Sequence, residues 1–434
     1  MTDNQQVATE LFVVGNGLDL QCGLETTYEN FLKYVFSQKK SELSIDTEEI
    51  DLSIVADRFE NRFDFYSTNW FEHSGKEVYS FVNIWYQIFL HEKMLENRNW
   101  SNVESMIAHY LKEEHLIYNI ASVIKYKKRK IVSLGKQTVY RVPSMQGSQT
   151  NFFAKLAYVL VKKDLTLLQL PETESYQKIQ EIYDNVVEYE LEDIQSLVAD
   201  VLLHELNELE YDFQCFLRYR LSETPNYNEK INSLLRRMVD PEKEIFTAVP
   251  IPYHLLSFNY SSLWSQMFRP KFSPVKFLDV HGKIPDDEGL RFSNIIFGVD
   301  HSLFQASELE YRFTKTYRTL KSYTQGFEKI GEGRDIYTKD IQTIKFYGHS
   351  LAEADYAYFQ QLFDYYDLYS NPNLSLIFFY SIYDKSKSHE IEHEQIMAIS
   401  RLIEKYGQTL DNKDHGKNLL TRLIQTKRLQ MIKI

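Results

Sequence analysis

Short apolar runs that indicate strands occur toward the two ends of this 434-residue chain, and a long segment with the spacing of helices separates the two groups. The first run covers residues 11–14, and every later one follows residue 250. Between residues 41 and 245, glycine and proline are sparse and apolar side chains recur at spacings of three and four, which is typical of helices. Because apolar strands that alternate with helices indicate a parallel sheet with both faces covered, we predict an α/β protein whose mostly parallel sheet is split in sequence by a large helical insertion. The later strands are predicted at 254–258, 275–280, 294–297, 343–347 and 374–380.

This pattern divides the chain into three predicted parts. Residues 1–40 and 246–385 form the sheet domain, residues 41–245 form the helical insertion, and residues 386–434 form C-terminal helices that pack on the sheet domain. Segment 128–149 has no regular pattern and is expected to be a loop. Helices are predicted at 76–97, 101–127, 150–165, 173–190, 191–221, 389–406 and 416–432.

The charge and cysteine content exclude several classes of protein. The formal charge is −12, from 49 basic and 61 acidic side chains, which argues against non-specific nucleic-acid binding through phosphate contacts. Two cysteines, Cys22 and Cys215, exclude a disulfide scaffold and a four-cysteine zinc module and fit a reducing compartment. The first residues lack the pattern of a signal peptide, and no run of about 20 apolar residues occurs. We therefore expect a cytoplasmic protein without a membrane partner.

Ligands of parallel sheets bind at the carboxyl ends of the strands, so the residues after each predicted strand are the first candidates for a site. Gly15-Asn16-Gly17 follows the first strand and precedes a helical pattern. Two glycines allow a tight turn and a close approach of the backbone, and the start of a helix offers N–H groups to a phosphate. Leu20 stands in place of the third glycine of G-x-G-x-x-G, so a plain tight turn is the alternative.

Polar residues also follow the next two predicted strands. Asn259 comes after strand 254–258, where its amide could bind a ligand or form an Asx-turn. His281 and Gly282 come after strand 275–280. A histidine at that position could act as an acid or base near neutral pH, or could be a structural hydrogen-bonding group.

The strand at 343–347 is followed by Gly348-His349-Ser350, and Asp355 lies in the helix beyond. Such a Gly-x-Ser turn can bind phosphate or ribose hydroxyls. It also approximates a nucleophile elbow with Ser350 as the nucleophile. That alternative needs an acid and a base further along the chain, and only one clear strand is left to position them. The candidates for the acid and base are Asp384, His389 and His393.

Two charged motifs and one isolated carboxylate have plainer explanations. His389 to His393 match H-E-x-x-H, which binds zinc on a buried helix, but here the motif lies at a charged helix start and is interpreted as solvated. The basic run 125–130 could touch nucleic acid or an acidic partner, although such runs are usually solvated. Glu104 is expected to point into solvent. No metal is therefore expected.

The chain resembles the AbiH-like abortive-infection family of bacterial phage-defence proteins. The resemblance lies in six segments that occur in order: LFVVGNGLDLQCGLETTYENFL, LLSFNYSSL, DVHG, IIFGVD, FTKTYR and FYGHSLAEADYAYF. It spans residues 10–385, and most of 40–245 matches only loosely. The resemblance implies a role in the abortive infection of phage-infected cells.

The motifs of that family are in turn similar to the sirtuin-type NAD-binding core. This similarity implies a Rossmann-like, sirtuin-like sheet and NAD as the ligand or substrate. It further implies that Asn259 contacts the nicotinamide ribose and that His281 acts on the ribose hydroxyls, so that these two are the catalytic residues. The residues implied to bind the cofactor are Gly15, Asn16, Gly17, Asp19, Gly282, Gly348, His349, Ser350 and Asp355.

The chain departs from sirtuins in ways that change the expected chemistry. Phe258 and Ser261 stand where sirtuins have Gln and Asp, which affects recognition of the nicotinamide end. Asp19 stands where they have Ser, and its charge would repel phosphates unless it faces a ribose hydroxyl, a cation or the protein. The zinc module of sirtuins is absent, which argues against a protein deacetylase.

Three functions follow as hypotheses. The first is an enzyme that hydrolyses the N-glycosidic bond of NAD or a related nucleotide and depletes it during infection. The second is a non-catalytic nucleotide sensor that acts through a partner. The third is an effector that targets nucleic acid through the basic run 125–130. A homo-oligomer and a phage-derived trigger are compatible with each of them.

Overall fold

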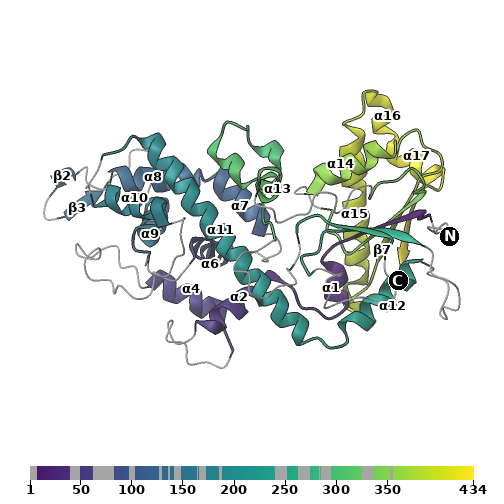
Figure 1. The fold of residues 1–434 in the computed structure, drawn as a ribbon, viewed down its shortest axis with the longest axis horizontal. Coiled ribbons are helices and arrows are strands. Elements are labelled where there is room, and N and C mark those ends of the chain that lie inside the picture. Colours follow the sequence, from purple (N-terminus) through teal and green to yellow (C-terminus); the bar gives the residue numbers. More distant parts are fainter. Residues whose placement is uncertain are drawn as a thin grey trace. The chain divides into compact units, whose positions relative to one another are not determined.

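The computed structural model divides the chain into two compact units, each of which is described by itself (Figure 1). The sheet unit comprises Met1–Thr26, Leu217–Ile296 and Leu320–Ile434, and the helical unit comprises Thr27–Phe216 and Phe297–Thr319. The structure describes residues 7–39, 49–61, 83–96, 103–126, 130–134, 137–140, 148–163, 165, 173–184, 188–239, 252–261, 274–282, 284, 295–324, 336–351 and 355–434.

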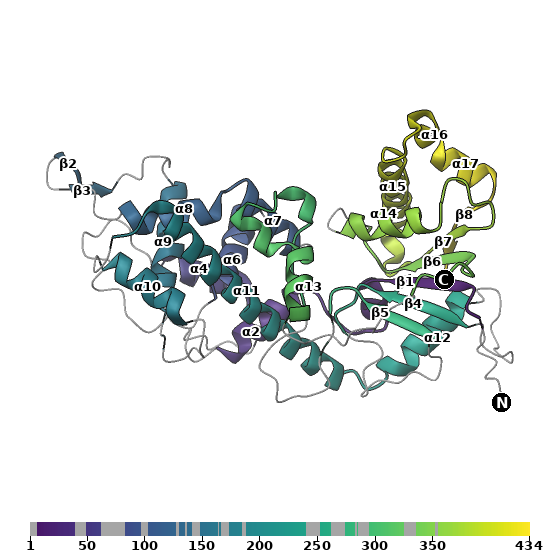
Figure 2. The ribbon, with the colours of Figure 1, turned by 45° about the horizontal axis from the view of Figure 1, so that its top comes forward.

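The sheet unit is built on six parallel strands in the order β5-β4-β1-β6-β7-β8 (Figure 2). Numbered by their succession along the chain, the strands run 3-2-1-4-5-6, so the direction of progress through the sheet reverses at β1. In the register, Glu10 of β1 lies opposite Tyr253 on one side and Thr343 on the other. The strands are β1 (Glu10–Val14), β4 (Tyr253–Ser257), β5 (Lys276–Asp279), β6 (Thr343–Tyr347), β7 (Ser375–Tyr380) and β8 (Leu429–Lys433).

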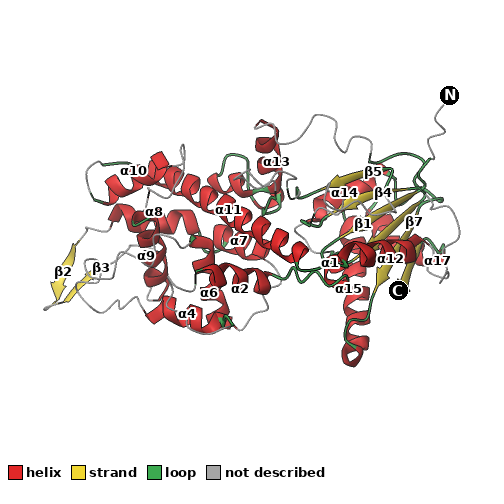
Figure 3. Ribbon diagram, turned by 60° about the horizontal axis from the view of Figure 1, so that its bottom comes forward, coloured by secondary structure: helices red, strands yellow, loops and turns green. Residues whose placement is uncertain are grey.

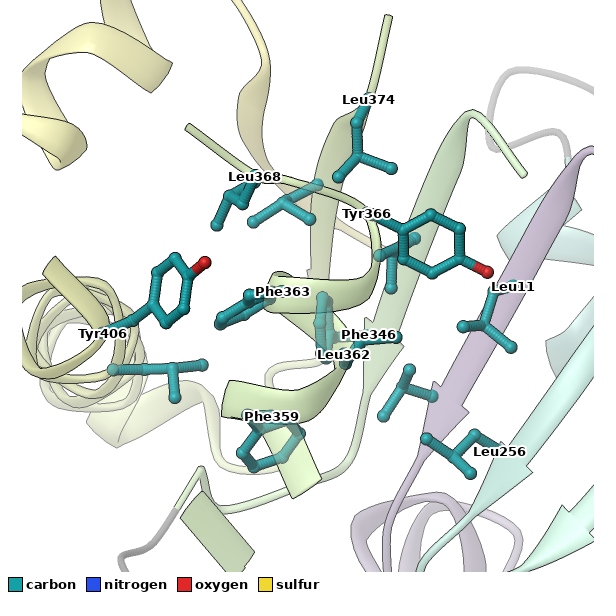
Figure 4. Packing of buried hydrophobic residues seen from close by; sticks show 14 of the residues in the cluster. Leu11, Leu256, Phe346, Phe359, Leu362, Phe363, Tyr366, Leu368, Leu374 and Tyr406 are labelled. Atoms are coloured by element: carbon teal, nitrogen blue, oxygen red, sulfur yellow. The ribbon is translucent and has the colours of Figure 1, made fainter. Parts of the chain in front are cut away.

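Helices cover both faces of this sheet (Figure 2). On one face, alternate residues of the strands such as Leu11 and Phe346 pack against α14 and α15 in one buried cluster (Figure 4). On the other face, Phe12 stacks on Tyr253 with ring centroids 4.5 Å apart, and Lys345 forms a buried ion pair with Glu10 at 2.8 Å. The helices of this unit are α1 (Gly17–Gln21), α12 (Tyr227–Val239), α14 (Tyr356–Tyr365), η5 (Lys385–Lys387), α15 (Ser388–Gly407), α16 (Lys413–Lys417) and α17 (Leu419–Gln425).

The C-terminal segment corrects one prediction. The helix predicted at 416–432 is wrong beyond Gln425, because the chain turns there and Leu429–Lys433 adds β8 to the sheet. The buried guanidinium of Arg428 donates to the carbonyls of Leu374 and Leu368, which ties the start of β8 to the neighbouring strand and its preceding loop. The strand predicted at 294–297 is also wrong for its described part, because residues 295–297 form no strand. The nearest β contact is an isolated bridge between Val299 and Thr314.

The helical unit consists mainly of helices that follow the predicted spacing of apolar residues (Figure 3). The single helix predicted at 101–127 is in fact two, because His115 adopts a left-handed φ of 46° between them. The predicted loop at 128–149 contains a two-stranded hairpin. The elements are α2 (Tyr28–Gln38), α4 (Leu52–Asn61), α6 (Ile84–Glu96), α7 (Val103–Lys112), α8 (Leu116–Tyr126), β2 (Lys130–Leu134), β3 (Gln137–Tyr140), α9 (Ser148–Val161), α10 (Thr173–Tyr183), α11 (Leu191–Ser222), η2 (His301–Leu303), η3 (Leu309–Phe313) and α13 (Lys315–Thr324).

Two buried ion pairs hold the segment Phe297–Thr319 to the helical unit. Lys315 lies 3.0 Å from Glu104, and Arg318 pairs with Glu210 and also donates to the carbonyl of Phe297 at 2.6 Å. The prediction that Glu104 points into solvent is therefore wrong, because its side chain is only 11 % exposed and faces Lys315.

The boundaries of the two units fall at residues that differ from the predicted division. Residues 27–39 and 297–319 belong to the helical unit, whereas α12 belongs to the sheet unit. The long helix α11 continues across the boundary at Phe216. Within the part of the chain that the structure describes, no helix is long and apolar enough to cross a bilayer.

Candidate functional site

Two loops meet where the strand order reverses, at the carboxyl ends of β1 and β6. Gly15 donates its N–H to the carbonyl of Tyr347 at 3.0 Å, and Gly17 donates to that of Gly348 at 2.7 Å. A Cβ atom on Gly17 would lie 2.6 Å from the Cα of Gly348, and Gly348 itself has a φ of +69°. The glycines at these positions are thus needed for a direct contact between two backbones.

The same contacts bear on the predicted phosphate loop. The N–H groups of Gly15, Gly17 and Leu18 all donate to carbonyls of the protein, and α1 has only five residues. The exposed Asn16 accepts a hydrogen bond from the hydroxyl of Thr26 at 2.6 Å through its Oδ1. Phosphate binding by this loop stays a prediction, and it would require these N–H groups to exchange carbonyl partners for phosphate oxygens.

Asp19 is the centre of a buried polar cluster on one side of β4. Its Oδ1 accepts from the hydroxyl of Tyr227 at 2.6 Å and from Nδ2 of Asn259 at 3.0 Å. Ser261 lies in the same cluster, with its Oγ 3.4 Å from the hydroxyl of Tyr227. The sequence left a ribose hydroxyl, a cation or the protein as partners for the charge of Asp19. The side chain is 1 % exposed, and in the structure its partners are residues of the protein.

Burial controls the protonation of this cluster. Loss of solvent raises the pKa of Asp19 to about 6, although hydrogen bonds from Tyr227, Ser261 and Asn259 act in the opposite direction. Burial and the adjacent carboxylate raise the pKa of Tyr227 well above its usual value. Asp19 is therefore a carboxylate that changes charge close to neutral pH.

A second cluster forms around Asp355 at the ends of β5 and β6. Nε2 of His281 lies 2.9 Å from one carboxylate oxygen of Asp355, and Nε2 of His349 lies 3.2 Å from the other. Nδ1 of His349 accepts the N–H of Leu351 at 2.8 Å. Because Nδ1 accepts from the backbone, the ring proton of His349 lies on Nε2, which faces Asp355.

His281 is held differently from His349. Because a carboxylate only accepts hydrogen bonds, Nε2 of His281 carries a proton, and Nδ1 is the nitrogen that can take up a second one. The rings of Phe258, Tyr260 and Tyr358 surround the imidazole, with centroids 5.4, 5.9 and 5.7 Å away, and His281 is 3 % exposed. This is the arrangement of a histidine that a carboxylate orients in an apolar setting.

The structure separates the two residues predicted to be catalytic. Phe258 and Asn259 are consecutive, but Phe258 contacts the rings of His281 and His349, whereas Asn259 faces Asp19. Asn259 and His281 thus belong to two different clusters on the two sides of the β4 end. The contribution of Tyr227 was not anticipated, because it lies in the regular helical pattern of α12 and nothing in the local sequence marks it.

The other predicted site residues have diverse positions. Gly282 has a φ of +80° and Leu351 one of 55°, so both turns contain a left-handed residue. Ser350 is exposed. For the hydrolase alternative, the acid Asp384 is engaged as the cap of η5, where it accepts from the N–H and hydroxyl of Ser386.

The charged motifs do not form a site in the part of the chain that the structure describes. His389 and His393 are exposed on the first turns of α15, and no group of three or more His, Cys, Asp or Glu among the described residues could hold a metal ion. Lys125 pairs with Glu190 at 3.1 Å. Residues 127–129 of the basic run lie outside the described residues.

Comparison with known proteins identifies one relationship. The model of a family described as bacteriophage abortive infection AbiH matches residues 11–380, which include all the residues of both clusters. No curated protein and no solved structure matches the chain.

Proposed function

This chain belongs to the bacteriophage abortive infection AbiH family, and we propose that it acts by binding NAD, or a related nucleotide, at the carboxyl end of its sheet and hydrolysing the N-glycosidic bond. Family membership gives the role in phage abortive infection. The proposed reaction would supply the means, since loss of NAD stops the metabolism on which phage replication depends.

The topology of the sheet supports a nucleotide ligand. The order 3-2-1-4-5-6 is the one found in doubly wound dinucleotide-binding sheets, which bind their ligand outside the carboxyl ends of the strands where the order reverses. In this chain that position lies between β1 and β6, where the loops of Gly15 and Gly348 meet. A sirtuin-like core would place its ligand at the same edge.

The observation that carries the enzymatic proposal is the pair of His281 and Asp355. In the proposed hydrolysis, the oxygen of a water molecule attacks the anomeric carbon of the ribose, and the C–N bond breaks with its electron pair leaving on nicotinamide. Nδ1 of His281 takes the proton of the attacking water, and Asp355 stabilises the imidazolium that forms. His349 fixes the carboxylate from its other side, so the base keeps one orientation.

The buried amide of Asn259 supports recognition of the same ligand. Its Oδ1 has no hydrogen-bond partner among the described residues, and Asn259 is fully buried. A hydrogen-bond donor on the nucleotide would satisfy this oxygen. Without such a donor, the buried unpaired oxygen destabilises the protein by about 1–3 kcal/mol.

The test is to incubate the purified protein with NAD and to measure nicotinamide by chromatography. We expect the wild-type protein to release nicotinamide and His281→Ala to lower the rate at least 100-fold, since general-base catalysis contributes about 10²–10⁴. Asp355→Asn should lower the rate to a similar degree, because its amide could not stabilise the imidazolium. His415→Ala is the matched control, because His415 is an exposed histidine of the same unit that stacks on Tyr369.

The outcomes separate the enzyme from the alternatives. Release that persists in a folded His281→Ala variant would refute the assigned base. Retention of NAD without release would favour the nucleotide sensor. If the protein neither retains NAD nor releases nicotinamide, the nucleotide proposal as a whole is refuted.

A further inference from the structure

We propose that Asp19 is a positioning residue that fixes the side-chain amide of Asn259, so that Oδ1 of this amide is presented to a hydrogen-bond donor of the bound nucleotide. This inference rests on the proposed function and assigns a part of it to a residue that would not touch the ligand. The donor is an O–H or N–H group of the nucleotide, because a carbonyl oxygen can only accept hydrogen bonds.

The position of Asp19 excludes a role on the protein surface. It lies in the middle of α1, is 1 % exposed, and accepts from two side chains that come from distant parts of the chain. Tyr227 begins α12, and Asn259 follows β4. The carboxylate of Asp19 is therefore held by α12 and by the residues that follow β4, and Tyr227 also contacts Ser261 of the latter.

An ionised carboxylate dictates the orientation of the amide. It can only accept hydrogen bonds, so Asn259 must turn Nδ2 toward Asp19, as observed at 3.0 Å. Oδ1 is then directed away from Asp19. The N–H of Asn259 donates to Oγ of Ser257 at 3.2 Å, which holds the backbone as well.

The oxygen turned away from Asp19 is the second, independent observation. Asn259 is 0 % exposed and its Oδ1 has no hydrogen-bond partner in the described part of the chain. A buried carbonyl oxygen without a partner is unusual in a folded protein, because more than nine in ten buried polar groups are paired. A ligand donor explains why this oxygen is left unpaired by the protein.

Protonation of Asp19 would remove this control. A neutral carboxyl group can donate as well as accept, so both orientations of the Asn259 amide become compatible with it. Of the other groups that act on Asp19, Tyr227 and Cys22 stay neutral between pH 5 and 8, because burial raises the pKa of the tyrosine well above its usual value and that of the thiol to about 12. Lys230 and Arg237 of α12 are the basic side chains that act on Cys22, and both lower the pKa of its thiol.

The experiment is a double-mutant cycle on nucleotide affinity at pH 7.5. The affinities of the wild type, Asp19→Asn, Asn259→Ala and the double variant are measured by calorimetric titration with ADP-ribose, which the proposed reaction cannot consume, and with NAD. We expect Asp19→Asn to weaken binding about 10-fold in the wild-type background and to have no effect in the Asn259→Ala background, because Asp19 acts through Asn259. A loss seen with both ligands places the donor in the ADP-ribose part, as a hydroxyl or the adenine amino group, and a loss seen with NAD alone identifies the carboxamide.

Two results would overturn the inference without touching the proposed function: unchanged affinity in Asp19→Asn, or the same loss in both backgrounds. Absence of binding of both nucleotides to the wild type would overturn the proposed function and this inference together. If Asn259→Ala does not fold, Tyr227→Phe replaces it. That change removes a donor to the carboxylate and should shift the midpoint of the pH-dependent affinity upward, and an unchanged midpoint would refute the positioning role.

Discussion

The contact between the loops that follow β1 and β6 depends on glycines. Gly348 has a positive φ, and a Cβ atom placed on it would meet the backbone of Gly17 at 2.8 Å. Gly23 also has a positive φ, of +84°, but a Cβ there would meet only the end of the flexible Lys230 side chain. The two glycines thus share a backbone conformation and differ in what surrounds them.

This difference gives a stability prediction. Gly23→Ala should destabilise the sheet unit by about 1–2 kcal/mol, the cost of a left-handed conformation for alanine. Gly348→Ala should cost a further 1–3 kcal/mol or so, because the two loops must also move apart. Chemical denaturation followed by circular dichroism measures both, and equal losses would show that the loop contact contributes nothing.

Asp19 gives a second prediction at the same scale. Its pKa is about 6 in the folded protein against an ordinary value of 3.8, so the folded state binds the proton more tightly than the unfolded state. The stability that this proton contributes is therefore complete below pH 3.8 and is lost as the pH rises through 6.

Asp19→Asn should consequently raise the unfolding temperature of the sheet unit at pH 7.5 relative to the wild type, and the gain should shrink toward pH 4.5. The asparagine can still accept from Tyr227 and Asn259. Thermal scans without ligand at the two pH values measure the effect, and a variant that is less stable at pH 7.5 would contradict it.

Among the elements, the segment 297–319 shows how charge fixes a loop to a helix. Arg318 and Glu210 are 9 % and 2 % exposed, and Arg318 also donates to Asn207 at 2.7 Å. Arg312 pairs with Asp200 at 2.7 Å, but those side chains are 30 % and 48 % exposed. The first pair is buried and the second is largely solvated.

Removal of one partner should therefore have very different effects at the two positions. Arg318→Met leaves Glu210 buried without its cation and should destabilise the helical unit by about 3–5 kcal/mol. Arg312→Met should cost about 0–1 kcal/mol, as expected for an exposed pair. Urea denaturation compares them, and similar losses would refute the importance of burial here.

The elements that the sequence predicts well are those with strong apolar patterns. Strands β1, β4, β6 and β7 are largely buried and rich in apolar residues, so the apolar pattern of the sequence predicts their positions. β8 was missed because it is a half-exposed edge strand that directly follows a helix. The break at His115 was missed because nothing in the spacing of apolar residues marks a single left-handed residue.

The candidate site was predicted in its members but not in its pairings. The carboxyl ends of parallel strands meet at one edge, so Asn259, His281 and Gly348 could be named from the topology. Which of them bond to one another depends on residues far apart in sequence: Asp19 and Asn259 are 240 residues apart, and His281 and Asp355 are 74 apart. Local patterns hold no information about such contacts.

For the whole molecule, two compact units predict two unfolding events. Scanning calorimetry of the wild type should show two transitions, because each unit has its own core. Gly348→Ala should lower the temperature of one transition and Arg318→Met that of the other. A single transition that both variants shift equally would show that α11, which continues across the boundary, couples the units into one cooperative structure.

The position of β1 has a consequence for how the protein is synthesised. The central strand of the sheet leaves the ribosome first, but one of its partners, β6, ends at Tyr347. At about 5–20 residues per second, translation needs on the order of 15–65 s to travel from one to the other. Until β4 has been made, the apolar segment Leu11–Val14 has no partner strand, and its side that pairs with β6 stays open for the whole of that time. Most of the helical unit emerges before either partner strand. The nascent chain is therefore a natural substrate for chaperones that shield apolar segments at the ribosome exit.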